Sequence, residues 1–136
     1  MRRIVNIYYV SRLFDPLFSL SDEEIDSLSA INFNDEAEAK GFFQQRILEN
    51  FERYGPKSKI MCRNALQYVL CTSASPYSFP DLFPYGELPV EAPDDTKLFF
   101  SWLWQILFSN ERIPKCDEDE FIINNDYNAP NSAYIK

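Results

Sequence analysis

Acidic side chains are the residues of this chain best placed to do chemistry, since it has 21 Asp and Glu but no histidine. The lack of histidine excludes His-based triads, His general bases and His metal ligands. Asp94-Asp95-Thr96-Lys97 superficially resembles a nuclease string, but it lacks a first acid on a separate strand, so helix capping is the simpler interpretation. Residues 117–120 are all acidic but lack the pattern of a calcium-binding loop, which favours a solvated turn.

Cysteines and glycines supply no other familiar site. Cys62, Cys71 and Cys116 lack the paired spacing of a zinc site, and their odd number favours reduced thiols in the cytoplasm. If Cys62 and Cys71 share a helix, nine steps of about 100° place them on opposite faces, so they cannot bridge each other. No glycine-rich phosphate loop is present. The sequence therefore predicts a protein that is not an enzyme and that needs no cofactor or metal.

Acidic and basic residues are segregated into separate stretches of the chain. No Lys or Arg lies between Arg12 and Lys40, where eight acids occur, whereas residues 40–63 carry a charge of +4 and residues 64–96 are again acidic. The formal net charge is −8, which disfavours direct binding to nucleic acid. Sorting of this kind creates surface fields of one sign that attract partners of the opposite sign. We interpret the basic stretch as a solvated helix face.

The elements that must position these acids are predicted to be mainly α-helices. We expect residues 1–136 to form one compact domain of four to five helices with a long Pro/aromatic loop. Ser21 with Glu24, and Asp35 with Glu38, are capping-box patterns that each predict a helix start. The first predicted helix begins at Ser21, and the second spans 35–54 and ends before Gly55–Pro56. A third helix is predicted from about Ser58 to Cys71, and a fourth from Asp94 or Asp95 to about Asn110.

The two ends of the chain leave alternatives open. Residues 1–14 suit a strand by composition or a buried helix ended by Asp15–Pro16, and we lean to the helix because the rest of the chain is helical. Residues 121–123 suit a short strand, beside residues 4–10 if those are extended. Residues of about 125–136 suit a loose or irregularly docked tail.

The apolar segment Leu98–Phe108 is long enough to cross only about half a bilayer, so no membrane span is expected. Lys97, Ser101 and Gln105 recur every fourth residue and leave a thin polar stripe. We predict a central helix buried on nearly all sides. Alternatively, Trp102 and Trp104 contribute to a dimer or partner interface, so that either a monomer or a homodimer is compatible with the sequence.

Five prolines between Pro76 and Pro93 are interleaved with four aromatic residues. Such dense prolines exclude a regular element. The aromatic residues of this loop either pack into the core of the domain or are presented to a partner. The second alternative is physically reasonable because proline lowers the entropy cost of holding an extended shape.

The candidate partner-binding residues combine the first acidic cluster with this loop. In such an interface, acids near the rim speed encounter and apolar anchors slow release. The candidates are Asp22, Glu23, Glu24, Asp26, Phe79, Phe83, Tyr85, Glu87 and Glu91.

In size, acidity, aromatic content and lack of a catalytic motif, the chain resembles the small acidic immunity proteins that neutralise bacterial contact-dependent or polymorphic toxins. The resemblance implies cytoplasmic, toxin-specific inhibition of a cognate basic protein such as a nuclease. Two other functions stay open from the residues: a phage-type inhibitor or nucleic-acid mimic whose acids imitate phosphates, and a structural or adaptor subunit with a Trp-rich interface helix.

Overall fold

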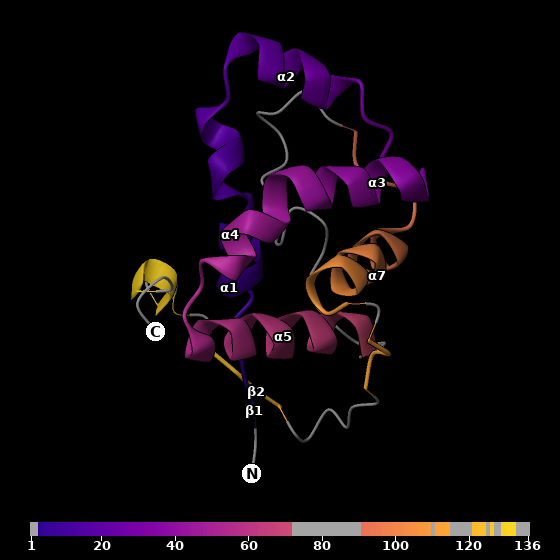
Figure 1. Ribbon diagram of the computed structural model, residues 1–136. Helices are drawn as coiled ribbons and strands as arrows, with labels where there is room; N and C mark the ends of the chain where they lie inside the picture. Colours follow the sequence, from indigo (N-terminus) through magenta and orange to yellow (C-terminus); the bar gives the residue numbers. More distant parts are fainter. Residues whose placement is uncertain are drawn as a thin grey trace.

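The computed structural model describes residues 3–71, 91–109, 111–114, 121–124, 126 and 129–132 (Figure 1). The described chain is mainly helical with two short strands, which confirms the predicted fold class. In chain order the elements are β1 Arg3–Val5, α1 Tyr8–Ser11, the 3₁₀ helix η1 Arg12–Ser19, α2 Asp22–Ser29, α3 Glu36–Phe42, the π-helix η2 Phe43–Ile47, α4 Leu48–Glu52, α5 Pro56–Cys71, α7 Thr96–Leu107, β2 Phe121–Ile123 and the 3₁₀ helix η4 Ala129–Ser132.

The aromatic helix α7 lies at the centre of the core, between α3 and α5 (Figure 1). Its first turn is capped by Asp95, whose Oδ1 accepts the backbone N–H of Leu98 at 2.9 Å. Phe99 is fully buried and contacts the rings of Phe33, Phe43 and Phe100, with centroids 5.0–5.2 Å apart. The predicted burial of this helix is therefore confirmed, although it ends at Leu107 rather than near Asn110.

Both tryptophans are buried inside the chain itself. Trp102 is 5% exposed and Trp104 is fully buried, whereas Leu98 is 45% exposed at the start of the helix. The tryptophans therefore present no surface on which a second copy or an adaptor partner could dock. None of the helices in the described ranges is long and apolar enough to cross a membrane.

One continuous helical segment runs through α3, η2 and α4, close to the single helix predicted for residues 35–54. The prediction missed the π-helical turn at Phe43–Ile47. The following helix, α5, begins at Pro56, two residues earlier than expected. Proline suits the first helical position because its missing N–H would have no helical partner there.

The helix caps follow the sequence patterns, with one difference. At α2 the capping box is complete, since the Ser21 hydroxyl accepts the Glu24 N–H and the Glu24 carboxylate accepts the Ser21 N–H. At α3, Asp35 accepts the Glu38 N–H at 2.9 Å, but the Glu38 carboxylate accepts the N–H of Asn32 instead. The Asp35 N–H donates to the Asn32 carbonyl, so the second box is only half formed.

The N-terminal segment contains both of the predicted alternatives, a strand followed by helical turns. β1 pairs in parallel with β2 in the register Arg3–Phe121, Ile4–Ile122 and Val5–Ile123, which confirms the predicted C-terminal strand and its neighbour. The helical turns do not end at Asp15–Pro16, because η1 continues to Ser19. The fixed φ of proline fits a 3₁₀ turn, and such turns are held by i to i+3 hydrogen bonds.

Buried amides join segments that are distant in sequence. Asn6 accepts the Tyr8 N–H and donates to the Asp126 carbonyl, so it anchors part of the predicted C-terminal tail. Gln67 accepts from Arg3 and donates to the Pro114 carbonyl. Among the buried side-chain polar atoms of the described residues, none lacks a hydrogen-bond partner.

The cysteines differ from the expectation of reduced thiols. Cys71, at the end of α5, is disulfide-bonded. Cys62 is a free thiol that is completely buried, and its burial raises its pKa far above the usual range for cysteine. Because the thiolate is the reactive form, Cys62 is inert in the folded protein. Cys116 lies outside the described residues.

Asn50→Leu should lower the free energy of unfolding by about 1–3 kcal/mol, because its buried Nδ2 donates to the Arg12 and Leu13 carbonyls, which would lose their donor. Urea denaturation measures the change. Gln44→Leu is the control, since Gln44 is an exposed neighbour on the same helical segment. Equal stability of the two variants would show that these hydrogen bonds do not stabilise the packing of η1 on α4.

Candidate functional site

The acids of α2 do not form one uniform patch. Glu24 is engaged within the fold: its carboxylate completes the capping box and accepts from Arg46 Nη1 at 2.6 Å. These hydrogen bonds, with Arg46 first, lower the pKa of Glu24. Glu24 therefore stays ionised at neutral pH, and it is a structural acid rather than one free for a partner.

The other acids of this cluster are open to solvent. Asp22, Glu23 and Asp26 are exposed, and their carboxylates make no ion pair with any described residue. At about 100° per residue, Asp22 and Asp26 share one row of the helix, whereas Glu23 shares a row with Ser27. The unpaired acids thus spread over more than one side of α2.

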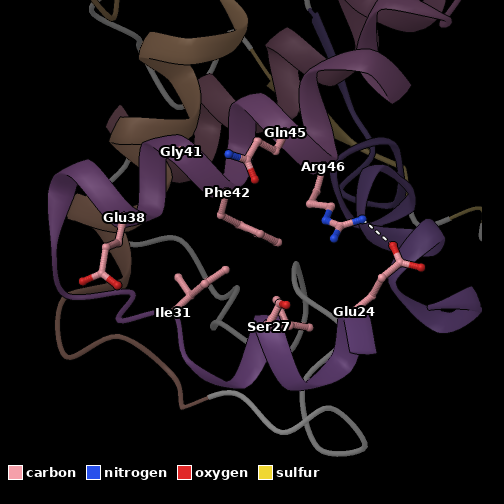
Figure 2. Close-up of a pocket in the computed structure, with 9 residues that line it drawn as sticks. Glu24, Ser27, Ile31, Glu38, Gly41, Phe42, Gln45 and Arg46 are labelled. Carbon is pink, nitrogen blue, oxygen red and sulfur yellow. Dashed lines mark hydrogen bonds and ion pairs between the residues drawn. The ribbon is translucent and has the colours of Figure 1, made fainter. Parts of the chain in front are cut away.

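A groove separates α2 from the segment formed by α3 and η2, and we call it the α2–η2 groove (Figure 2). Its volume is about 300 Å³. The ion pair of Glu24 with Arg46 lies at one end, Glu38 lies at the other, and Phe42 points into the space between the helices. The described lining residues are Glu24, Ser27, Leu28, Ile31, Glu38, Gly41, Phe42, Gln45 and Arg46.

The groove combines an apolar floor with a charged rim. Leu28 and Phe42 are buried and Ile31 is half-buried, so the floor is held by the core beneath it. Glu24, Glu38 and Arg46 supply the charges, with one more carboxylate than cation. The exposed side chains of this lining, Ser27, Glu38 and Gln45, are polar, so the groove presents a mainly polar surface to solvent.

The π-helix η2 borders two hollows at once. Gln45 and Arg46 line the α2–η2 groove and also a smaller hollow of about 220 Å³ on the other side of Arg46. That second hollow is also lined by Leu17, Leu20, Glu49, Asn50 and Arg53. A single π-helical turn within an α-helix is rare and frequently lies at a functional site.

Gly41 lines the groove one turn before Arg46, and the fold does not require a glycine there. Its φ lies outside the left-handed region, and a Cβ added to it would meet no atom of a described residue within 4 Å. Glycine inside a helix is destabilising by about 0.5–1 kcal/mol relative to alanine. The sequence patterns did not predict this groove. The one feature that could have indicated it is Gly41, a glycine within an otherwise strong helix.

Three bases of the stretch 40–63 form ion pairs, one within α3 and two with acids that are distant in sequence. Lys40 contacts Glu36 and donates to Gln105 at 2.6 Å, and Arg46 pairs with Glu24 across 22 residues of sequence. Arg53 and Lys57 are exposed, as a solvated helix face requires, whereas Lys40, Arg46 and Arg63 are half-buried. The positive charge of these three bases is matched by acids of the same chain.

Arg63 makes the most extensive of these contacts. Both of its Nη atoms donate to the Glu111 carboxylate, at 2.6 and 3.0 Å, and its guanidinium lies over the rings of Trp104 and Phe108. Trp104 Nε1 donates to the Glu111 carbonyl at 2.7 Å. The hydrogen bonds from Arg63 lower the pKa of Glu111. This cluster fixes the turn after α7, where Ser109 adopts a φ of 54°.

The remaining candidate residues fall in two places. Phe79, Phe83, Tyr85 and Glu87 lie outside the described residues, as do residues 117–120. Glu91 is exposed and lines a polar hollow of about 340 Å³ together with residues 29–34, just beyond the C-terminal end of α2. The fold therefore brings Glu91 close to the α2 region, although the two are far apart in sequence.

Among the residues that the structure describes, no group of three or more Asp, Glu or Cys side chains could hold a metal ion. The chain matches no known protein family, no curated protein and no solved structure. The candidate site is therefore defined by its own geometry alone.

Stability should fall as the pH drops below about 4.5, because Glu24 and Glu111 have folded pKa values below that ordinary value. Their contribution is present above pH 4.5 and is lost as the pH falls through the folded values. Glu24→Gln combined with Glu111→Gln should flatten this loss in urea unfolding measured between pH 7 and pH 3. Glu52→Gln is the control, since Glu52 is exposed and forms no ion pair with a described residue. An unflattened profile would contradict the role of the two arginine contacts.

Gly41→Ala should raise the free energy of unfolding by about 0.5–1 kcal/mol, because alanine restricts the unfolded chain and its Cβ clashes with no described residue. Chemical denaturation measures the gain. A loss of stability would mean that the helix backbone or the groove wall needs glycine for structural reasons.

Proposed function

We propose that this chain is a non-catalytic acidic binding protein that neutralises a cognate basic protein, most simply as an immunity protein that blocks a bacterial toxin such as a nuclease. One observation carries the proposal. Three of the described bases in the basic stretch pair with acids of the same chain, whereas Asp22, Glu23 and Asp26 on α2 are exposed and form no ion pair with a described residue. This negative charge therefore lies at the surface beside the α2–η2 groove.

The two alternative functions, a nucleic-acid mimic and a structural or adaptor subunit, are less well supported. A nucleic-acid mimic needs a long, regular line of acids, but α2 has eight residues and is about 12 Å long. A structural or adaptor subunit would need the tryptophans of α7 at the surface, and both are buried. A protein partner is therefore favoured over direct binding of nucleic acid, and no cofactor is part of the proposal.

The cytoplasmic location proposed for such an inhibitor has one observation against it. Cys71 is disulfide-bonded, and disulfides persist mainly in oxidising compartments. Neutralisation by binding does not depend on the compartment, so the proposal for the function does not rest on the location.

The immobilised chain should retain a protein of net positive charge from extracts of its native cell at low salt, and a stoichiometric amount of the chain should abolish the activity of that partner. The variant with Asp22, Glu23 and Asp26 all changed to Lys should bind with a slower association rate at low salt and melt at nearly the wild-type temperature, because the three side chains are exposed. Surface plasmon resonance and thermal unfolding measure the two effects.

Two outcomes would contradict the proposal. The first is a captured partner whose activity is unchanged when it is saturated with the chain. The second is an association rate that is the same for the wild type and the charge-reversed variant at low salt. A variant with Glu52 and Lys57 exchanged controls for rearranged surface charge away from α2 at unchanged net charge, since both residues are exposed and lie outside the α2 region.

A further inference from the structure

We propose that Cys71 is cross-linked to Cys116, and that this disulfide is a redox-sensitive link that stabilises the pairing of β2 with β1. Cys71 ends α5 and is disulfide-bonded. α5 contacts both α7 and β1, so a link at its end acts on the chain that connects α7 to β2 (Figure 1). The partner of Cys71 and the effect of reduction follow from the residues along α5, independently of the proposed function.

The cysteine content of the chain identifies the partner of Cys71. The chain has three cysteines, and Cys62 is a free thiol that is fully buried. Cys62 and Cys71 also lie nine residues apart on α5, which places them on opposite faces of the helix. Cys116 is therefore the cysteine that can supply the second sulfur atom.

The described chain after α7 runs along one side of α5 in the direction of its C-terminal end. Arg63 Nη2 donates to the Glu111 carboxylate at 2.6 Å. One turn further along α5, Gln67 Nε2 donates to the Pro114 carbonyl at 3.3 Å. Residues four apart are neighbours on the surface of a helix, so both contacts lie on the same side of α5.

The next position on that side of α5 is Cys71. It lies four residues, or about 6 Å of helix, beyond Gln67. Two residues of extended chain beyond Pro114 span about 7 Å, which brings Cys116 to the level of Cys71. The two contacts along α5 therefore bring the two cysteines within reach of each other, as a disulfide requires.

Cys71 is half-buried, so a dithiol reductant can reach the disulfide, whereas Cys62 has no exposed surface. One thiolate of the reductant attacks a sulfur atom of the disulfide, and the second thiolate resolves the mixed disulfide. Cys71 and Cys116 gain two electrons and two protons and become thiols, while the reductant becomes a disulfide. Because Cys62 is inaccessible, it does not take part in this exchange.

The non-covalent contacts of β2 are weak, so its pairing depends on the link. Two strands on their own are only marginally stable in water. Ile122 and Ile123 are 45% and 40% exposed, and Phe121 is buried against the ring of Tyr68, with centroids 5.4 Å apart. The ion pair of Glu111 lies at the surface and contributes little. An oxidising compartment would therefore stabilise the β1–β2 pair, and a reducing compartment would loosen it.

Trypsin digestion of the air-oxidised chain without a reductant, followed by mass spectrometry, tests the pairing. The lysines and arginines place the three cysteines in separate peptides, 60–63, 64–97 and 116–136. Peptides 64–97 and 116–136 should appear joined, at the sum of their masses less two hydrogen atoms, and dithiothreitol should separate them. A link to peptide 60–63, or separate recovery of peptides 64–97 and 116–136 from the oxidised chain, would overturn the proposal.

Amide hydrogen exchange of the intact chain, measured by NMR, tests the effect of reduction. The Asn124 N–H donates to the Val5 carbonyl at 2.8 Å, so its exchange reports the pairing of β2 with β1. Four residues separate Cys116 from β2, whereas thirteen separate α7 from β2. Because the entropy cost of closing a loop grows with its length, dithiothreitol should speed exchange at Asn124 by about sixfold. The Phe108 N–H, which donates to the Trp104 carbonyl, should exchange at an unchanged rate.

Cysteine variants give matched controls for the exchange experiment. Cys71→Ser and Cys116→Ser should each exchange at Asn124 at the rate of the reduced wild type and should not respond to dithiothreitol. Cys62→Ala keeps both linked cysteines and should respond as the wild type does. An increase at Asn124 of less than twofold on reduction of the wild type, or a response of either serine variant to dithiothreitol, would overturn the redox-sensitive link. The wild-type comparison needs no substitution, so it decides the question even where a serine variant fails to fold.

Discussion

Burial of α7 is the constraint on which the rest of the structure depends. A helix that is apolar on almost all sides must be enclosed, and α3, α4 and α5 supply the enclosing surfaces. Because these helices direct their apolar sides to α7, their outer surfaces carry the polar and charged residues. α2 is left beyond α3, at one end of the molecule (Figure 1). The α2–η2 groove lies between α2 and the α3–η2 segment, and the Glu24–Arg46 ion pair joins the two at one end.

Electrostatic pairing gives the sorted charges of the chain a structural role. Glu24 with Arg46 joins the first acidic stretch to the basic segment, and Glu111 with Arg63 joins the turn after α7 to the same segment. Surface ion pairs of this kind each contribute little to stability, but they fix the position of the ends of α2 and of the turn after α7. Pairing engages Lys40, Arg46 and Arg63, three of the six bases in this stretch, whereas the acids Asp22, Glu23 and Asp26 of α2 are exposed.

The sequence predicted the features that depend on local patterns. Ser21 and Asp95 cap the helices that their spacing indicated, and the apolar period of α7 gave its burial. It did not predict the π-helical turn, since no residue type specifies one, or the pairing partners of Arg46, since these depend on how α2 packs. The sequence therefore predicted the acids of α2 as part of the candidate site. It did not predict the groove beside them or the structural role of Glu24, because both depend on how the helices pack.

Binding of a basic protein at α2 is the central claim, and hydrogen–deuterium exchange of the chain, free and saturated with the protein captured from its native cell, tests it most directly. The expected result is slower exchange on complex formation in α2 and in the segment from α3 through η2, with α5 unchanged. Unchanged exchange in α2 and η2, with slower exchange confined to α5 or the β1–β2 pair, would place the interface elsewhere and contradict the claim.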